Sequence, residues 1–213
     1  MPVTRHIPES TIRRISHYLR ALEILESQEA TTVSSEELAQ RGGTTAAQVR
    51  KDLSHFGSFG KRGLGYSVAE LADRLRDILG LKCRWRVVLV GAGRIGSALF
   101  EYPYFVQRGY DCVAVLDSDP EKIGMSWGPV RIRPVEELEL VISSLKGDIV
   151  ILAVPPEAAQ DLADRAVEAG VRAILNFAPV QLRVPAEVHV TYVNLVLELE
   201  ALSFAITQAG SRT

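Results

Sequence analysis

The spacing of hydrophobic residues changes near residue 80, and this change predicts two domains of different class. Before that point, apolar residues recur at three- and four-residue steps and form one helical stripe: Ile12, Ile15, Leu19, Leu22 and Leu25. After it, short β-branched runs such as 87–90 alternate with helical patterns, which is typical of a parallel sheet buried on both faces. We therefore predict one domain over 1–80, an α/β domain over 81–193 and an apolar C-terminal helix over 194–213.

Capping residues and turns predict three helices and a wing in the first domain. Ser34 and Glu37 have the spacing of a capping box, which opens the second helix. A glycine pair ends that helix, and Thr44 or Thr45 caps the third. The glycine-rich segment 57–66 then indicates a β-hairpin wing, followed by a linking helix. This order is that of a winged-helix domain, which binds DNA.

Strands and helices alternate throughout the second domain. The predicted strands span 87–90, 112–116, 130–132, 149–154, 173–176 and 188–193. The predicted helices span 96–106, 135–145 and 157–169, and the C-terminal helix spans 195–206. The alternation predicts a Rossmann-like, doubly wound parallel sheet.

Composition and charge exclude several classes of protein. Apolar residues make up 47% of the 213-residue chain, yet no run reaches the roughly 18 residues that a membrane span needs. The N-terminus lacks the apolar stretch of a secretory signal, and two cysteines make no disulfide framework, so we expect a cytoplasmic protein. The net charge of −2 excludes a uniformly basic nucleic-acid binder, but residues 41–66 carry five basic residues against one acidic.

A glycine fingerprint follows the first strand of the second domain. In the segment 91–96, Gly91 permits a tight turn, Gly93 lets the backbone approach a pyrophosphate, and Gly96 allows close packing of helix and strand. The helix N-terminus supplies free N–H groups for the phosphates. Asp117 ends the next strand, where a carboxylate accepts hydrogen bonds from an adenosine ribose and repels a 2′-phosphate. We predict NAD(H) binding; a turn that binds CoA, flavin or no nucleotide is the alternative.

Two later strand ends face the same crevice of a doubly wound sheet. They are the segments 153–156 and 176–179, whose backbone groups suit a carboxamide and whose apolar side chains suit a nicotinamide ring. The cofactor-binding residues predicted from the two parts of the site are Gly91, Ala92, Gly93, Arg94, Ile95, Gly96, Asp117, Val154, Pro155, Asn176, Phe177, Ala178 and Pro179.

No side chain in the second domain is a good candidate for catalysis. His189 alternates with valines in a predicted strand, which is typical of a structural residue rather than a general acid or base. No cluster of His, Cys and carboxylate residues has the spacing of metal ligands. We therefore predict a regulator that is not an enzyme. An NAD-dependent oxidoreductase with a helical extension and a CoA- or nucleotide-binding interaction module are the rival interpretations.

The third helix and the wing carry the residues expected to bind DNA. Val49 and Leu53 face the core of that helix, and its polar side holds Gln48, Arg50, Lys51 and Ser54. Arg and Lys donate to guanine, and Gln reads adenine. Thr45 at the helix start and Lys61 and Arg62 at the wing tip complete the predicted DNA-binding set. A solvated basic surface is the alternative.

The motifs together resemble those of the Rex family of bacterial redox-sensing transcriptional repressors. The segments that carry the resemblance are 49–54, 56–57, 60–66, 91–96 and 174–179, in order and spacing. The resemblance covers essentially the whole chain and implies a homodimer with a C-terminal helix swapped onto the partner. It further implies that the dimer binds an inverted-repeat operator, reads the NADH/NAD+ ratio and leaves the DNA when NADH binds, with both nucleotides acting as effectors.

Three residues match the switching machinery that the resemblance implies. Tyr102 matches a tyrosine near the nicotinamide, and Arg20 matches an arginine that reaches the sensor region. Asn194 departs from the family, which usually has an aspartate that pairs alternately with that arginine and that tyrosine. An amide can still form a hydrogen bond but forms no ion pair with Arg20, so this departure bears on redox switching rather than on NADH or DNA binding.

Overall fold

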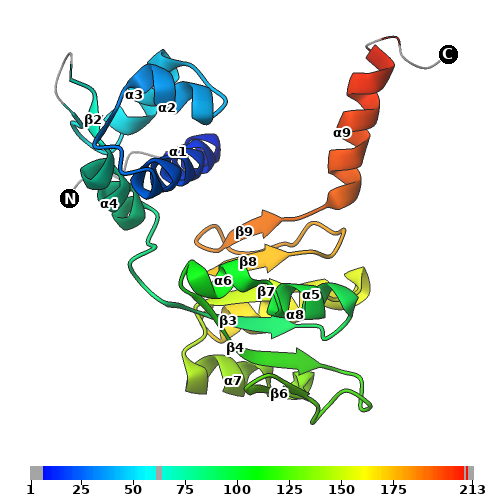
Figure 1. Cartoon of the computed structure of the whole chain (residues 1–213). Helices are drawn as coiled ribbons and strands as arrows, with labels where there is room; N and C mark the ends of the chain where they lie inside the picture. Colours follow the sequence, from blue (N-terminus) through cyan, green and yellow to red (C-terminus); the bar gives the residue numbers. More distant parts are fainter. Residues whose placement is uncertain (1–6, 61–63, 209, 211–213) are drawn as a thin grey trace. The chain divides into compact units, whose positions relative to one another are not determined.

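The computed structural model describes residues 7–60, 64–208 and 210, and it divides into two compact units (Figure 1). The first unit ends at Cys83 and the second begins at Arg84. No helix in the described part of the chain is both long and apolar enough to span a membrane.

The first unit is a small helical domain with a two-stranded ribbon. Its elements are α1 (Glu9–Ser27), β1 (Thr32–Val33), α2 (Ser35–Arg41), α3 (Ala46–Ser54), β2 (Tyr66–Ser67) and α4 (Val68–Ile78). The apolar stripe of α1 is buried as predicted except at Ile12, which is partly buried. Its other residues pack with Leu38, Val49, Leu53 and Leu75 into one core. Burial of this shared apolar face supplies most of the stability of such short helices.

The two predicted helix caps are formed. The Ser34 hydroxyl accepts a hydrogen bond from the backbone N–H of Glu37 at 3.0 Å, and Thr45 accepts one from Gln48 at 3.2 Å. Gly42 ends α2 against the ring of Tyr18, where a Cβ atom would lie 2.8 Å from the ring. The turn between α2 and α3 therefore needs a residue without a side chain.

The ribbon differs from the hairpin predicted over 57–66. Tyr66 pairs antiparallel with Val33, and Ser67 pairs with Thr32, so the described strand partner comes from before α2. Gly60 and Gly65 both have positive φ, and a Cβ atom on Gly60 would overlap the Gly65 carbonyl oxygen. Backbone atoms at the base of the predicted wing therefore lie in close contact, which only glycine permits.

The second unit contains a seven-stranded sheet in the Rossmann order. The strands are β3 (Trp85–Val90), β4 (Tyr110–Asp117), β5 (Ser126–Trp127), β6 (Val130–Pro134), β7 (Ile149–Leu152), β8 (Ala173–Asn176) and β9 (His189–Tyr192). Their order is β5-β6-β4-β3-β7-β8-β9, and every neighbouring pair is parallel except β5 with β6. The strand order reverses between β3 and β7, so a ligand crevice is expected at their carboxyl ends.

Helices cover both faces of this sheet. They are α5 (Arg94–Phe100), α6 (Pro103–Gln107), α7 (Leu138–Leu145) after a 3-10 turn (Val135–Glu137), and α8 (Pro156–Glu168). Val88 and Val90 pack with residues of α7 and α8, whereas Val87 and Leu89 pack with residues of α5 and α6. Both faces of β3 are therefore buried, which explains its uninterrupted apolar run.

One helix prediction was wrong. The helix expected over 96–106 is two helices, because α5 ends at Phe100 and α6 begins at Pro103. Proline has no backbone N–H to continue a helix and is accepted at a first helical position. The break places Tyr102 as the residue that precedes α6.

The last helix, α9 (Leu195–Gln208), buries none of its described side chains. Its apolar residues are more than half exposed: Leu195, Val196, Leu197, Leu199, Leu202, Phe204 and Ile206. Such a contiguous apolar surface marks an interaction site.

Candidate nucleotide and DNA sites

The turn after β3 has the geometry expected of a phosphate-binding loop. Gly91 has φ of +102°, and a Cβ atom there would overlap the carbonyl oxygen of Ala153. A Cβ atom on Gly96 would overlap the carbonyl oxygen of Gly91. Gly93 has open space around it, so its backbone is accessible to a ligand. The turn therefore needs glycine at Gly91 and Gly96, and the backbone at Gly93 is open, as a phosphate-binding turn requires.

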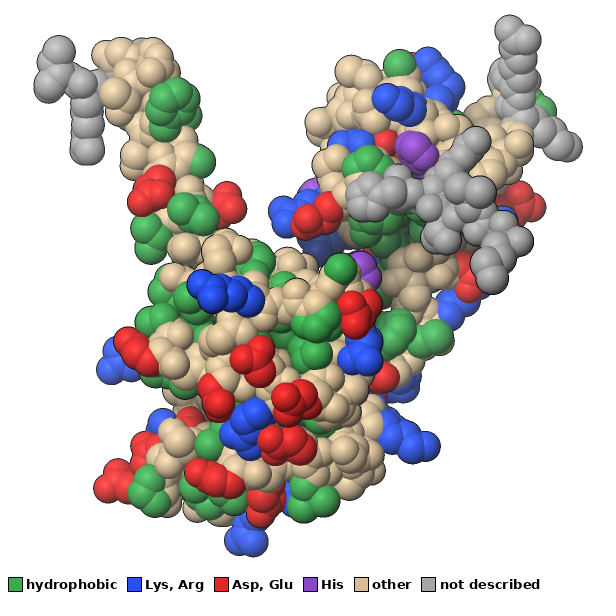
Figure 2. All heavy atoms as spheres, turned by 180° about the vertical axis from the view of Figure 1, so that it is seen from behind, with side chains coloured by type: hydrophobic (Ala, Val, Ile, Leu, Met, Phe, Trp, Pro, Cys, Tyr) green, Lys and Arg blue, Asp and Glu red, His purple; other side chains and the backbone are tan. Residues whose placement is uncertain are grey.

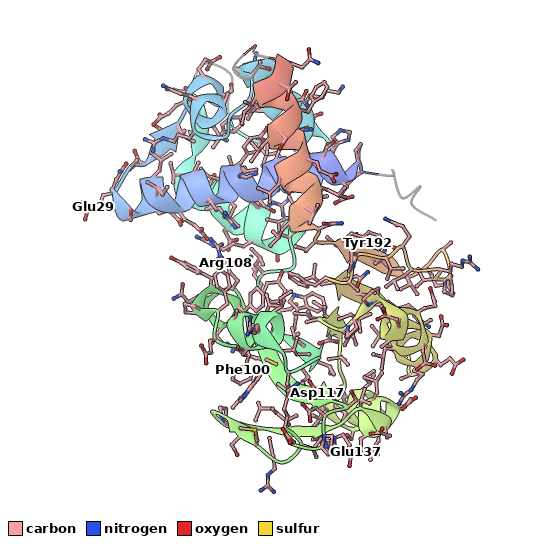
Figure 3. The ribbon with its side chains drawn as sticks, turned by 90° about the vertical axis from the view of Figure 1, so that its right-hand side faces the viewer. Glu29, Phe100, Arg108, Asp117, Glu137 and Tyr192 are labelled. Atoms are coloured by element: carbon pink, nitrogen blue, oxygen red, sulfur yellow. The ribbon has the colours of Figure 1, made fainter. Side chains whose placement is uncertain are left out.

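Asp117 stabilises the glycine turn and also lines the cleft beside it. Its carboxylate accepts hydrogen bonds from the backbone N–H groups of Ala92 at 2.6 Å and Asp119 at 2.8 Å. The Lys122 ammonium lies 3.4 Å from the same carboxylate and 3.3 Å from that of Asp119. Asp117, labelled in Figure 3, therefore anchors the glycine turn to the end of β4 and still lines the cleft.

A cleft of about 470 Å³ opens at the point where the strand order reverses. It brings together the predicted residues Gly91, Gly93, Asp117, Val154 and Pro155. The other described residues that line it are Val90, Ser118, Asp119, Lys122, Val135, Ala153, Ala158, Asp161, Leu162 and Arg165. Its position is that of the nucleotide crevice of doubly wound sheets.

Charged side chains of both signs border this cleft. The Arg165 guanidinium binds Glu139 through two hydrogen bonds of 2.6 and 2.9 Å and lowers the pKa of that carboxyl to about 2. Arg165 also donates to the carbonyl oxygen of Val135 at 3.1 Å. These bonds occupy the Arg165 guanidinium. Lys122, 3.4 Å from Asp117, is the other basic residue that lines the cleft among the described residues.

The predicted second half of the nucleotide site is shaped by Asn176. This side chain is fully buried, and its amide nitrogen donates to the carbonyl oxygens of Ala178 at 3.1 Å and Val180 at 2.9 Å. Its amide oxygen accepts from the backbone N–H of Ala178 at 2.9 Å. The side chain therefore folds the loop after β8, in which Pro179 is exposed, Phe177 is partly buried and Ala178 is buried.

The remaining predicted nucleotide residues lie around α5 and α6. Arg94 and Ile95 are exposed in the first turn of α5, directly after the glycine turn. The Tyr102 side chain is half-exposed, and its ring lies 5.4 Å from that of Tyr104 and 5.3 Å from that of Phe105 between centroids. Among the described residues, no three His, Cys, Asp or Glu side chains form a potential metal site.

The predicted DNA-binding side of α3 is exposed. Thr45, Arg50, Lys51 and Ser54 are exposed, and Gln48 is half-buried. Arg50 donates to the Ser35 hydroxyl at 2.9 Å and lies 3.3 Å from Glu36. The predicted wing residues Lys61 and Arg62 lie outside the described residues. Lys and Arg side chains and Asp and Glu side chains lie on the surfaces of both units (Figure 2).

A buried polar cluster between α3 and α1 was not predicted from the sequence. The Asp52 carboxylate is fully buried and accepts hydrogen bonds from Arg14 on α1 at 2.6 and 2.7 Å. Burial raises the pKa of Asp52, but hydrogen bonds from Arg14, Gln48 and Tyr18 outweigh this effect and hold it below its usual value. The sequence did contain a sign of this cluster. Asp52 has the helical spacing of the buried residues Val49 and Leu53, which places its charge on the side of the helix that faces the core.

Comparisons with known proteins cover both units. Residues 6–54 match the family model described as "Putative DNA-binding protein N-terminus", and residues 83–180 match the "CoA binding domain" model. Relatives named redox-sensing transcriptional repressor Rex include one from Carboxydothermus hydrogenoformans, which is 50% identical over 94% of this chain and 96% of its own. Another, from Thermus thermophilus, is 48% identical over 94% of each chain.

Solved structures similar to this chain include a Rex-family repressor called RSP. Its crystal structure with beta-NAD+ and operator DNA has a TM-score of 0.93, is 37% identical and covers 97% of this chain and 95% of that one. Its complex with beta-NADH has a TM-score of 0.87, with 36% identity and 96% coverage of each chain. The glycine turn, the helical N-terminal unit and these full-length similarities agree. The chain belongs to the Rex family of redox-sensing transcriptional repressors.

Proposed function

We propose that this protein represses transcription by binding an inverted-repeat operator, and that NADH binding releases it. The observation that carries the proposal is the presence, on one chain, of an open crevice behind a phosphate-binding glycine turn and of a recognition helix with an exposed basic side. NAD+ and NADH act as effectors, and the chain is a regulator rather than an enzyme, as its relatives' names indicate. A protein with this role acts in the cytoplasm.

NADH and operator DNA must weaken each other's binding by the same factor. If NADH weakens operator binding by a given factor, the operator weakens NADH binding by that factor, because both act on one equilibrium between two arrangements. The test is an operator-binding titration with NADH, NAD+, NADPH and CoA in parallel. Release by NADH alone supports the proposal. Release by CoA favours the rival nucleotide module suggested by the family model over 83–180, and steady NADH oxidation favours the oxidoreductase.

We further propose that the protein is a homodimer in which α9 crosses to the partner. Seven apolar side chains on α9 are exposed in the single chain, and a partner surface would bury them. An inverted repeat needs two recognition helices linked with two-fold symmetry. A second copy of this chain meets both requirements.

Replacement of Lys51 by alanine should reveal whether this exposed side chain reads a base or a phosphate. A base contact predicts a loss of about 1–3 kcal/mol concentrated at one operator position. A phosphate contact predicts a uniform loss and a salt slope smaller by about one unit. Fluorescence anisotropy over a range of salt concentrations measures both. Lys82→Ala removes the same charge from a lysine paired with Asp73 and serves as the control. Unchanged affinity and salt slope would place Lys51 outside the interface.

Replacement of Asp117 by alanine should narrow the preference for NADH over NADPH. The variant loses the carboxylate that repels a 2′-phosphate. It also removes one of the two carboxylates that pair with the Lys122 ammonium, which leaves this ammonium better able to attract a phosphate. NADH affinity should also fall, because the anchor of the Ala92 N–H is lost. Calorimetry with both nucleotides measures the ratio, and Asp111→Ala, at the opposite end of β4, is the control. Equal affinity of the parent protein for the two nucleotides contradicts this assignment of Asp117.

Replacement of Asn194 by aspartate should strengthen DNA binding if Arg20 pairs with residue 194. The Asn194 side-chain oxygen already accepts from the backbone N–H of Val196 at 3.0 Å, and an aspartate keeps this contact with the start of α9. An exposed ion pair adds about 0–1 kcal/mol, and partial burial changes that figure in either direction. Operator affinity without cofactor is measured for the parent, Asn194→Asp, Arg20→Ala and the double variant. A gain that persists without Arg20 means that the two residues do not communicate.

A further inference from the structure

The Asp52 carboxylate lies on the recognition helix α3, yet its side chain is 1% exposed and contacts α1. One oxygen accepts from Arg14 Nε at 2.6 Å and from the Tyr18 hydroxyl at 2.9 Å. The other accepts from Arg14 Nη2 at 2.7 Å, Gln48 Nε2 at 2.8 Å and Thr11 Oγ1 at 3.4 Å. Donors from two helices therefore surround a single buried charge.

These bonds restrict α3 more than its apolar contacts do. Val49 and Leu53 are buried on the same side of the helix, but apolar contacts are non-directional and allow a helix to roll or slide slightly. A guanidinium and a carboxylate joined by two parallel hydrogen bonds have one preferred geometry. The pair between Arg14 and Asp52 therefore determines how α3 is rotated on α1, and with it the direction of Arg50 and Lys51 on the exposed side.

The same carboxylate also holds a side chain that is predicted to contact a base. Gln48 lies one helical turn before Asp52, and its amide nitrogen donates to Asp52 at 2.8 Å. An amide reads a base through both its nitrogen and its oxygen, so its orientation decides which base edge it accepts. Without the carboxylate, the Gln48 amide has no partner on α3 to set that orientation.

We propose that Asp52 is a positioning residue for operator recognition and touches no DNA itself. It sets the rotation of α3 on α1 and orients the Gln48 amide toward the base that this amide reads. The proposal rests on the proposed function, in which α3 reads the operator. It predicts that a buried charge beneath the recognition helix controls sequence discrimination more than general DNA affinity.

The test compares Asp52→Asn, Gln48→Ala and the double variant in the full-length protein. Asp52→Asn keeps the size of the side chain but replaces one acceptor oxygen with an NH2 group that meets the donors of Arg14 or Gln48. Affinity is measured by anisotropy for the operator, for single-base operator variants and for unrelated DNA, without cofactor. Asp73→Asn is the matched control, because its carboxylate is exposed on α4 and paired with Lys82. NADH affinity and thermal unfolding show that each variant is folded.

We expect Asp52→Asn to lower operator affinity at least about tenfold, as the loss of a buried acceptor predicts, with little change for unrelated DNA. Discrimination should be lost at the operator position where Gln48→Ala loses it, and the double variant should lose no more there. If Asp52→Asn does not fold, Tyr18→Phe removes one hydroxyl donor but keeps the buried ring, and a smaller loss of discrimination is expected.

Three results separate the failure of this proposal from the failure of the proposed function. An unchanged ratio of operator to unrelated-DNA affinity in folded Asp52→Asn or Tyr18→Phe overturns the positioning role. A parallel loss for both kinds of DNA also overturns it, since that result indicates general destabilisation of the unit. Absence of operator binding by the parent protein rejects the proposed function itself.

Discussion

Gly96→Ala is expected to abolish measurable NADH binding and to leave an operator complex that NADH no longer dissociates. The added methyl group would overlap the carbonyl oxygen of Gly91, so the backbone of the phosphate-binding turn must move. Overpacking of this kind costs about 1–3 kcal/mol, and the displaced turn also loses its contacts with the ligand. We expect at least about a hundredfold loss of NADH affinity, which corresponds to about 3 kcal/mol. Calorimetry and an operator titration measure the two effects.

Gly93→Ala is the matched variant, because it adds the same methyl group where the protein leaves room. Apart from its own chain neighbours, no described residue has a heavy atom within 4 Å of a Cβ atom built at Gly93, and its φ is −84°. Its thermal stability should therefore equal that of the parent, whereas Gly96→Ala should melt at a lower temperature. A loss of NADH affinity in Gly93→Ala then reports close approach of the ligand itself. Normal NADH affinity in both variants would place the pyrophosphate elsewhere.

Truncation after Val193 is expected to convert the protein into monomers or aggregates that bind the operator poorly. The deleted segment contains α9, whose apolar side chains are exposed in the single chain; Leu195 and Phe204, for example, are 69% and 66% exposed. In the proposed dimer, loss of α9 leaves the two recognition helices unlinked, so binding of the second half-site loses its effective concentration. Linkage of this kind is worth about 10²–10⁴-fold in affinity. Sedimentation and anisotropy measure the mass and the operator affinity.

Full-length variants distinguish loss of the dimer from damage caused by truncation. Phe204→Glu places a charge on the apolar surface of α9 and should weaken dimerisation, whereas Thr207→Ser should leave it unchanged because it keeps the hydroxyl that bonds Ser203. NADH binding by the truncated chain shows whether its nucleotide unit remains folded. A soluble truncated dimer with normal operator affinity would refute the crossing of α9 to the partner.

Local sequence patterns were sufficient to predict most of the elements near the two sites. The caps at Ser34 and Thr45, the strand 87–90 and the glycine turn depend on interactions between residues close in sequence. The failed prediction over 96–106 has a local cause too, since Pro103 breaks that segment into two helices.

The hydrogen-bond partners of individual polar side chains could not be predicted from local sequence patterns. Asp117 was predicted from the sequence to bind a ribose, but only the folded structure shows that it also anchors Ala92, 25 residues earlier. Asn176 was predicted to bind the cofactor, and only the folded structure shows that its side chain holds the loop after β8. Neither contact follows from hydrophobic periodicity, because periodicity shows which side of an element is buried and not which polar atoms meet there.

The sequence by itself therefore determined the order of the elements, the glycine turn, the exposed side of the third helix and the family. The tertiary structure decided which donors satisfy each buried acceptor, and Asp52 is the clearest example. Its nearest neighbours on the buried stripe are apolar, while the Arg14 guanidinium that neutralises it lies 38 residues away on another helix. A buried charge needs a partner, and packing of α3 on α1 determines which residue provides it.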